Sequence, residues 1–223
     1  MSQTHARHDN RDTSTPGAVM QHSRRHDFFA AAFFGGRRHR VYRRLAAESG
    51  AQPGSRVLDV GCGTGYFTRV MAETVGSDGT AHGVDPSGEA IAHARSVTRV
   101  ANCTFSDGIA EHLDMPDGSY DVVVTSLMIH HLPEALRGQA MSEMFRVLRP
   151  GGSVLVAEFR PPASRIGRRL IRAHSPAMAA NRIDVLEQMV RQAGFEQVRG
   201  GDLRPWIRYV QAQKPTANSS RAG

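Results

Sequence analysis

Residues 56–72, RVLDVGCGTGYFTRVMA, decide the fold of this chain. The apolar run Arg56–Val60 predicts a buried strand, and the amphipathic pattern that starts at Tyr66 predicts a helix. Between them lie Gly61, Gly63 and Gly65. Three glycines in so short a stretch cost backbone entropy, so something must approach the backbone of this turn closely. The identity of that group is the first question about function.

The same alternation of strand and helix continues along the chain. We expect helices at residues 66–75, 87–97, 134–148 and 183–193, and further strands at 80–85, 102–107, 120–127 and 153–159. The last strands, 195–203 and 206–213, are separated by a short turn, which predicts one antiparallel edge. Alternating strands and helices indicate an α/β fold with a mostly parallel, doubly wound sheet. Such sheets bind ligands beyond the carboxyl ends of their strands.

Length and composition limit the possible functions. The 223 residues suffice for one core, and no run approaches the ~20 apolar residues of a membrane span. The N-terminus lacks the apolar core of a signal peptide, and Cys62 and Cys103 form no disulfide framework, so we expect a cytoplasmic protein. The sequence also offers no metal-ligand spacing, and we expect no metal site.

The net charge of +7 is unevenly distributed, because an acidic middle lies between two basic arms. A basic chain raises the possibility of nucleic-acid binding, but no motif with interleaved aromatic residues accompanies the charge. Nucleic acid is therefore not the favoured partner. A solvated surface, or one that contacts an anionic membrane, explains the arginine excess better.

The spacing of the glycines excludes two common ligands. A dinucleotide site requires G-x-G-x-x-G or G-x-G-x-x-A, whereas Tyr66 fills the sixth position here. A phosphate-binding P-loop requires a Lys-Ser or Lys-Thr pair after the glycines, and none follows. Asp59, two residues before the first glycine, disfavours a pyrophosphate and favours a cationic ligand.

Two further acids follow the next two strands. Asp85 ends the second strand in HGVDPS, where a carboxylate can accept both hydroxyls of a ribose, and Pro86 and Ser87 fix the turn into the next helix. Asp107 ends the third strand, where its carboxylate can accept from an adenine amino group. Together with Asp59 and the glycines, these acids describe a site for a nucleoside with a positive or zwitterionic tail.

Four stretches occur in an order that is typical of one family: VLDVGCGTGYFTRVMA, GVDPSGEAIAHAR, SDGIAEHLDMPDGSYDVVVTSLMIHHL and EMFRVLRPGGSVLVAEF. With them, residues 40–210 resemble the class I S-adenosylmethionine-dependent methyltransferases, in particular the group that includes ubiquinone and menaquinone biosynthesis enzymes. The resemblance implies a Rossmann-like, three-layer α/β/α fold. Its seven-stranded sheet would be mostly parallel, with the last strand antiparallel.

The resemblance also implies S-adenosylmethionine as the cofactor and assigns residues to it. The turn would hold its methionine portion, Asp85 its ribose and Asp107 its adenine. The full set of expected cofactor-binding residues is Asp59, Gly61, Cys62, Gly63, Gly65, Asp85, Pro86, Asp107, Gly108, Ile109 and Ser126. Ser126 or Leu127 would lie beside the sulfonium. The alternatives are that Asp59 caps the turn amides, that Asp85 and Asp107 are helix-cap or turn acids, and that Cys62 is a packing residue.

His130 and His131 follow the fourth strand, on the rim where methyl donor and acceptor should meet. A neutral imidazole there can take a phenolic or hydroxyl proton, so both are candidate catalytic residues, with a slight preference for His130. The alternative is that one histidine caps the following helix and the other packs beneath it. Glu158, at the end of the fifth strand, is a candidate for orienting the acceptor.

The variable segments should supply the acceptor pocket. We expect a disordered basic tail at 1–25, a helical cap at 26–50 with Phe28, Phe29, Phe33 and Phe34, the methyltransferase domain at 51–213, and a disordered tail at 214–223. The favoured function is methylation of a small, apolar, quinone-like or specialised metabolite. The basic amphipathic stretch ASRIGRRLIRAHS makes a lipid methyltransferase at an anionic membrane surface an alternative. A cofactor-binding scaffold without catalysis is another.

Overall fold

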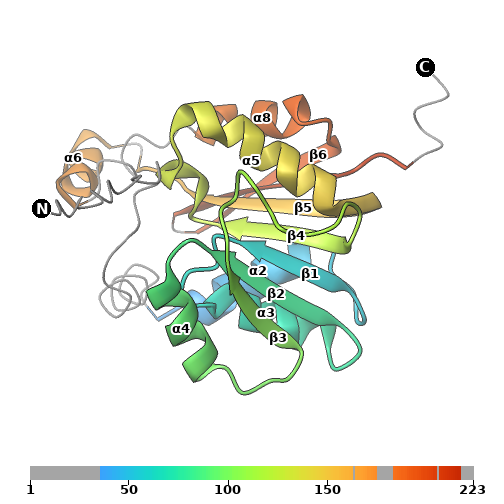
Figure 1. The fold of residues 1–223 in the computed structure, drawn as a ribbon. Helices are drawn as coiled ribbons and strands as arrows, with labels where there is room; N and C mark the ends of the chain where they lie inside the picture. The colour runs from blue at the N-terminus through green and yellow to red at the C-terminus, as the bar shows by residue number, and fades with distance from the viewer. Residues whose placement is uncertain (1–35, 163, 175–182, 205, 217–223) are drawn as a thin grey trace, which may run out of the picture.

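The computed structural model describes residues 36–162, 164–174, 183–204 and 206–216. They form a seven-stranded sheet with helices on both faces (Figure 1). The strand order is β3-β2-β1-β4-β5-β7-β6. The strands are β1 (Arg56–Val60), β2 (Thr80–Asp85), β3 (Cys103–Asp107), β4 (Tyr120–Ser126), β5 (Leu148–Phe159), β6 (Glu196–Leu203) and β7 (Ile207–Gln213).

The sheet is parallel from β3 to β5, and β7 runs antiparallel to both of its neighbours, β5 and β6. This confirms the predicted mostly parallel sheet with an antiparallel last strand. The antiparallel strand β7 does not lie at the edge of the sheet, where the sequence predicted it; β6 does. The chain forms β6 at the edge and then turns back to place β7 in the gap beside β5.

Helices cover the two faces of the sheet in separate groups. The helices are α2 (Arg38–Glu48), α3 (Tyr66–Val75), α4 (Gly88–Val97), α5 (Glu134–Val147), α6 (Arg165–His174) and α8 (Leu186–Gln192), with short 3-10 helices at Ile129–His131 and Ile183–Val185. Apolar residues of α2, α3 and α4 pack together in one core cluster with the sheet. Those of α5 and α8 pack in a second cluster on the opposite face. The result is the expected three-layer α/β/α arrangement.

The predicted element boundaries agree closely with the structure. Strands β2 and β3 end at Asp85 and Asp107, as expected. Gly194, with φ +96°, follows the end of α8. The stretch Arg149–Gly152 was expected to separate helix from strand, but β5 already begins at Leu148. Of the predicted cap at 26–50, the part Arg38–Glu48 is helical. Residues 26–35 with their phenylalanines, the tail 1–25 and residues 217–223 lie outside the described residues.

The order of the strands places a topological switch point between β1 and β4. From β1 the chain builds β2 and β3 on one side and then returns to build β4 and β5 on the other side. The helices that follow β1 and β4 therefore cover opposite faces. Ligands of open α/β sheets bind at the carboxyl ends of the strands at such a point. The glycine turn, residues 61–65, lies directly at this position.

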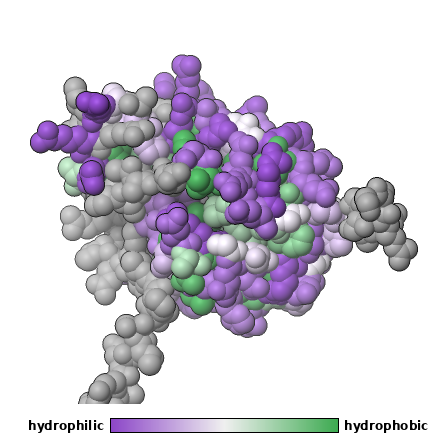
Figure 2. Space-filling view, turned by 90° about the horizontal axis from the view of Figure 1, so that it is seen from above, coloured by the Kyte–Doolittle hydropathy of each residue, from purple (hydrophilic) through white to green (hydrophobic). Residues whose placement is uncertain are grey.

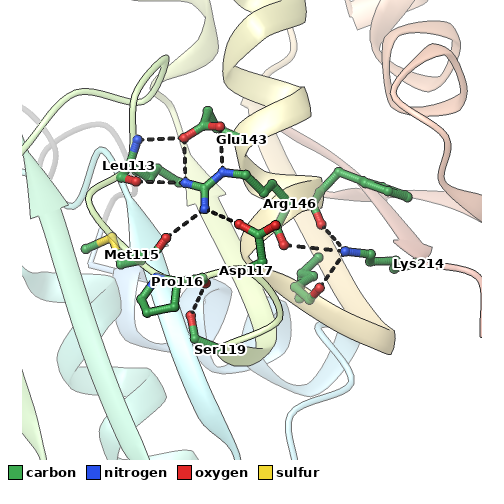
Figure 3. Close-up of polar contacts among 10 residues, drawn as sticks. Leu113, Met115, Pro116, Asp117, Ser119, Glu143, Arg146 and Lys214 are labelled. Carbon is green, nitrogen blue, oxygen red and sulfur yellow. Dashed lines mark hydrogen bonds and ion pairs between the residues drawn. The ribbon is translucent and has the colours of Figure 1, made fainter.

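Arg146 of α5 fixes the loop between β3 and β4 (Figure 3). Its guanidinium donates to the carbonyl oxygens of Leu113 and Met115 at 2.7 Å each, and it pairs with Asp117 at 2.7 Å. It also pairs with Glu143, whose carboxylate accepts from the amide of Leu113 at 2.8 Å. The loop that follows Asp107 is thus attached to a helix of the second core.

The end of the molecule that carries α5 and α8 is mostly hydrophilic, with small separate apolar patches (Figure 2). Among the described residues, Val97 and Val100 are the large apolar side chains classed as exposed. No helix in the described ranges is long and apolar enough to cross a bilayer.

Candidate functional site

The glycine turn is built from three residues in the left-handed backbone region. Gly61, Gly63 and Gly65 have φ values of +74°, +52° and +74°. A Cβ atom at Gly61 would overlap the side chain of Met128, and one at Gly65 would overlap the ring of Phe105. At Gly63 a Cβ would meet nothing within 4 Å. Two of the glycines are therefore required by the protein's own packing, and Gly63 is the one beside which open space remains for a ligand.

A non-glycine residue in the left-handed region lies beside this turn. Leu127, the residue after β4, has φ +58°, which a side chain with a Cβ rarely adopts. Its amide donates to the carbonyl of Ala157 at 2.8 Å, so β5 holds the strained turn in place. The turn directs Met128 against Gly61. Non-glycine residues in this region cluster at functional sites, and nothing in the local sequence predicted this one.

Asp59 lies inside β1 and is only 1% exposed. Its carboxylate accepts a hydrogen bond from the hydroxyl of Thr68 in α3 at 2.7 Å. Burial, with a smaller contribution from the charge of Asp85, raises the pKa of Asp59 to about 7, although the hydrogen bonds from Thr68 oppose the shift. A cation beside it would favour the ionised form. Asp59 is thus a buried acid that accepts from Thr68 of α3, and these contacts do not support the alternative in which it caps the turn amides.

Asp85 and Asp107 are direct partners on neighbouring parallel strands. The carboxylate of Asp85 accepts from the amide of Gly63 at 2.8 Å and from the amide of Ser87 at 2.9 Å. Asp107 is exposed at the tip of β3. The structure therefore places two acceptors side by side at the carboxyl edge, next to the open Gly63.

The remaining predicted cofactor residues surround the same edge. Cys62 packs against Gly83, and burial raises the pKa of its thiol well above the usual value, as expected for a packing residue. Pro86 is exposed at the start of α4, whereas Gly108 and Ile109 are half-buried just after β3. The amide of Gly108 donates to the carbonyl of Asp85 at 3.2 Å. The hydrogen bonds thus connect the segments that follow β2 and β3.

Ser126, at the end of β4, has a partner that sequence reasoning missed. Its hydroxyl donates to the phenolic oxygen of Tyr42 at 3.2 Å. Tyr42 belongs to α2 and is 6% exposed, and burial raises the pKa of its hydroxyl. Its ring also contacts Tyr66 and Phe67, with centroid distances of 5.4 Å and 5.0 Å. The predicted cap is therefore attached, through α2, to the edge that carries the glycine turn.

The two predicted catalytic histidines occupy the 3-10 helix Ile129–His131 after β4. Nδ1 of His130 lies 2.7 Å from a carboxylate oxygen of Glu158, and these two side chains are only 2% and 1% exposed. The other oxygen of Glu158 accepts from the amide of Ile129 at 2.8 Å. His131 is half-buried, with its ring centroid 4.0 Å from that of His130. Glu158 thus orients His130, and His131 is the more exposed of the two histidines.

No group of three or more metal-binding side chains is found among the described residues. What the carboxyl edge offers is open space beside Gly63, two adjacent carboxylates, and a buried acid that a cation would stabilise. This donor set suits a nucleoside with a cationic tail. The histidine pair beyond β4 adds a group that can take up a proton.

Comparison with known proteins agrees with this chemistry. A family model described as a methyltransferase domain matches residues 57–152. The chain is 32% identical over 188 residues to the ubiquinone/menaquinone biosynthesis C-methyltransferase UbiE of Shewanella pealeana, which covers 72% of this chain and 74% of that protein. The enzyme of the same name from Vibrio campbellii is 32% identical over 189 residues, covering 72% of each chain.

The solved structures show the same fold. A SAM-dependent methyltransferase from Aquifex aeolicus superimposes with a TM-score of 0.65 at 20% identity, covering 77% of this chain and 88% of that one. The resemblance seen in the four sequence stretches is therefore confirmed, and S-adenosylmethionine is the cofactor of the family. The chain belongs to the class I S-adenosylmethionine-dependent methyltransferases.

Proposed function

We propose that this enzyme methylates a small, apolar acceptor with a quinone-like ring. The observation that carries the proposal is the 32% identity, over 72% of the chain, to C-methyltransferases of ubiquinone and menaquinone biosynthesis. The histidine pair supports it, because a hydroquinone-type ring becomes a better carbon nucleophile when its hydroxyl loses a proton. Methyl transfer removes the charge on sulfur, so the protein acts mainly by positioning the reactants and excluding water.

In this proposal the carboxyl edge of β1, β2 and β3 holds the cofactor. Asp85 accepts from the ribose hydroxyls and Asp107 from the adenine amino group, and the open backbone at Gly63 faces the methionine portion. Asp59 supplies the negative charge that favours the cationic tail. Two observations support this assignment: Asp85 and Asp107 lie opposite each other on the neighbouring strands β2 and β3, and the space beside Gly63 is open.

The histidine pair is the proposed proton acceptor. We assign the contact with the acceptor to His131, since the side chain of His130 is 2% exposed and is bound to Glu158. His130 and Glu158 then act as positioning residues behind it. This reverses the slight preference for His130 that the sequence suggested, and the reason is burial.

A specific observation favours one second candidate, a lipid acceptor at an anionic membrane surface. Arg165, Arg169 and Arg172 of α6 are all exposed and recur at helical spacing, so they share one side of the helix. Vesicle co-sedimentation that disappears at high salt would support this candidate.

The test is transfer of a labelled methyl group from S-adenosylmethionine to hydroquinone acceptors and to a lipid extract, with calorimetry of cofactor binding alongside. We expect labelled hydroquinone product. We also expect Asp85→Ala to weaken cofactor binding at least tenfold, whereas Asp78→Ala, at an exposed turn, leaves it unchanged. Unchanged affinity in Asp85→Ala would refute the ribose assignment. Tight cofactor binding without turnover on any acceptor would favour a non-catalytic scaffold.

The same assay tests the histidines. His131→Ala should retain cofactor binding and lower kcat by about 10²-fold or more, in line with general base catalysis. Glu158→Gln should shift the pH profile of kcat with little change in cofactor affinity. A kcat for His131→Ala equal to that of the parent removes this residue from the mechanism.

A further inference from the structure

A basic pocket of about 520 Å³ lies at the carboxyl end of β5. Its wall is formed by Arg37, Arg160, Arg204 and Trp206, together with Pro161 and Pro162. The three arginines come from separate parts of the chain. Arg37 immediately precedes α2, Arg160 immediately follows β5, and Arg204 lies in the turn between β6 and β7. The fold thus brings three arginines to the wall of one cavity.

The charge of this pocket is only partly compensated. Arg160 pairs with Asp202 at 2.9 Å. Arg37 and Arg204 are exposed, and neither forms an ion pair with a carboxylate in the part of the chain that the structure describes. Guanidinium groups bind carboxylates and phosphates through two parallel hydrogen bonds. An excess of guanidinium in one cavity therefore favours an anionic ligand.

Trp206 gives the same pocket an aromatic wall. Its indole lies against the ring of Phe159, with 6.4 Å between the centroids. Its carbonyl accepts from the amide of Arg160 at 2.7 Å, which ties the β6–β7 turn to the end of β5. Two prolines, with fixed φ angles, follow Arg160. The pocket is thus held by backbone contacts and suits a ligand with a planar or apolar body.

The position of the pocket relates it to methyl transfer. It lies at the same carboxyl edge of the sheet as the glycine turn, on the side of β5 and α2. The residue before Phe159 is Glu158, which orients His130. α2, which begins directly after Arg37, carries Tyr42, and the hydroxyl of Tyr42 accepts from Ser126 at the end of β4. The pocket is thus connected, through β5 and α2, to segments assigned to the reaction.

We propose that this arginine–tryptophan pocket binds an anionic group, a carboxylate or a phosphate, on the ring or apolar body of the methyl acceptor. The inference rests on the proposed function and narrows its substrate class to acceptors that carry a negative charge. The same chemistry is presented by a free aromatic acid and by the headgroup of an anionic lipid.

Trp206 provides the test, because it is the only tryptophan of the 223-residue chain. Its fluorescence is followed while the full-length protein is titrated with benzoate, phenyl phosphate and the neutral comparator benzamide. In separate samples the protein is titrated with vesicles of phosphatidylcholine, with and without phosphatidylglycerol. We expect a saturable change with the aromatic anions and at least tenfold weaker binding of benzamide.

Matched variants separate a built site from general attraction to positive charge. Arg37→Gln/Arg204→Gln should weaken anion binding at least fivefold. The control Arg43→Gln/Arg191→Gln removes the same charge from exposed positions outside the pocket and should leave the affinity unchanged. Melting temperatures verify that both pairs are folded. Equal weakening by both pairs, or no fluorescence response to any anion or vesicle, would overturn the proposal.

The arms also identify the source of the anion. A response to the soluble aromatic anions supports a free acceptor, and a response only to vesicles with phosphatidylglycerol supports a lipid headgroup. The fluorescence titration detects binding without turnover. Anion binding in this titration, with no methyl transfer in the activity assay, would therefore refute the proposed function but not the anion-binding pocket. Methyl transfer to neutral acceptors with no anion response would refute the pocket alone.

Discussion

Asp59 combines two properties that oppose each other in the ligand-free protein. It is almost fully buried within β1, and burial raises its pKa to about 7. An ionised carboxylate at such a position lowers stability unless a positive group compensates it. We interpret this as a site whose electrostatics are completed by the cationic cofactor.

The first prediction concerns the pH dependence that Asp59 imposes. Its pKa is about 7 in the folded state and about 3.9 when unfolded, so the folded state binds the extra proton between these values. Its contribution to stability is therefore fully present below pH 4 and is lost as the pH rises through 7. Asp59→Asn stays neutral, so at pH 8 its unfolding free energy should exceed that of the parent by about 1 kcal/mol or more, and its melting temperature should be higher. Near pH 4 the two proteins should differ little in stability.

Thermal unfolding of parent and variant between pH 4 and pH 8, without cofactor, measures this difference. The exposed Asp78→Asn is the control and should follow the parent. Calorimetry should show weaker binding of S-adenosylmethionine to Asp59→Asn. If the parent is as stable as Asp59→Asn at pH 8, then ionisation of Asp59 does not lower the stability of the protein, and the prediction is wrong.

The second prediction distinguishes the glycines. Gly63 and Gly54 both have positive φ and open space around the position of a Cβ, but Gly54 precedes the amino end of β1. Either substitution by alanine should cost about 1 kcal/mol of stability, from the left-handed backbone alone. Only Gly63→Ala should also weaken cofactor binding, by about tenfold or more, since its methyl group would occupy the open side. Similar cofactor affinities in the two variants would refute the assignment of Gly63.

At the scale of elements, the cofactor edge depends on how its loops are held. Arg146 joins the β3–β4 loop to α5 through Leu113, Met115, Asp117 and Glu143 (Figure 3). Lys214, after β7, donates to the carbonyl oxygens of Phe145 and Leu148 at 2.8 Å and 2.7 Å at the end of the same helix. The end of α5 thus connects a loop on the cofactor side with the last strand.

The third prediction is that this network makes stability sensitive to acid. The Arg146 hydrogen bond lowers the pKa of Glu143 to about 2. A lowered pKa gives stability that is present above the unfolded value, near 4.3, and is lost as the pH falls toward 2. The parent should therefore lose more stability than Glu143→Gln between pH 5 and pH 3. Denaturant unfolding at these two values measures it, and parallel losses would contradict the role of Glu143.

Elements were predicted from the sequence more accurately than their contacts. The apolar runs and the glycine, proline and acidic residues at their ends determine strands and helices locally, which is why β1 and α3 begin and end at the expected residues. The partners of the site residues come from distant segments. Thr68 bonds Asp59 from the next helix, Met128 fills the space at Gly61, and Tyr42 reaches Ser126. No local pattern encodes these contacts, because they depend on how the layers pack.

At the scale of the whole molecule, the residues proposed for the cofactor and those proposed for the acceptor lie on different parts of the sheet. The edge formed by β1, β2 and β3 carries the acids assigned to the cofactor, and the edge formed by β4, β5 and β7 carries the histidine pair and the arginine–tryptophan pocket. α2 contacts both regions, since it begins beside Arg37 and packs Tyr42 against Tyr66 and Phe67. This helix therefore couples the two sides.

The last prediction measures that coupling through the hydrogen bond between Tyr42 and Ser126, whose oxygens are 3.2 Å apart. Tyr42→Phe and Ser126→Ala each remove one partner, and each should cost about 1 kcal/mol of unfolding free energy. If α2 is fastened to β4 by this bond, the double variant should cost less than the sum of the two, with a coupling of about 0.5–1.5 kcal/mol in denaturant unfolding. Additive losses would mean that aromatic packing alone holds α2 on the sheet.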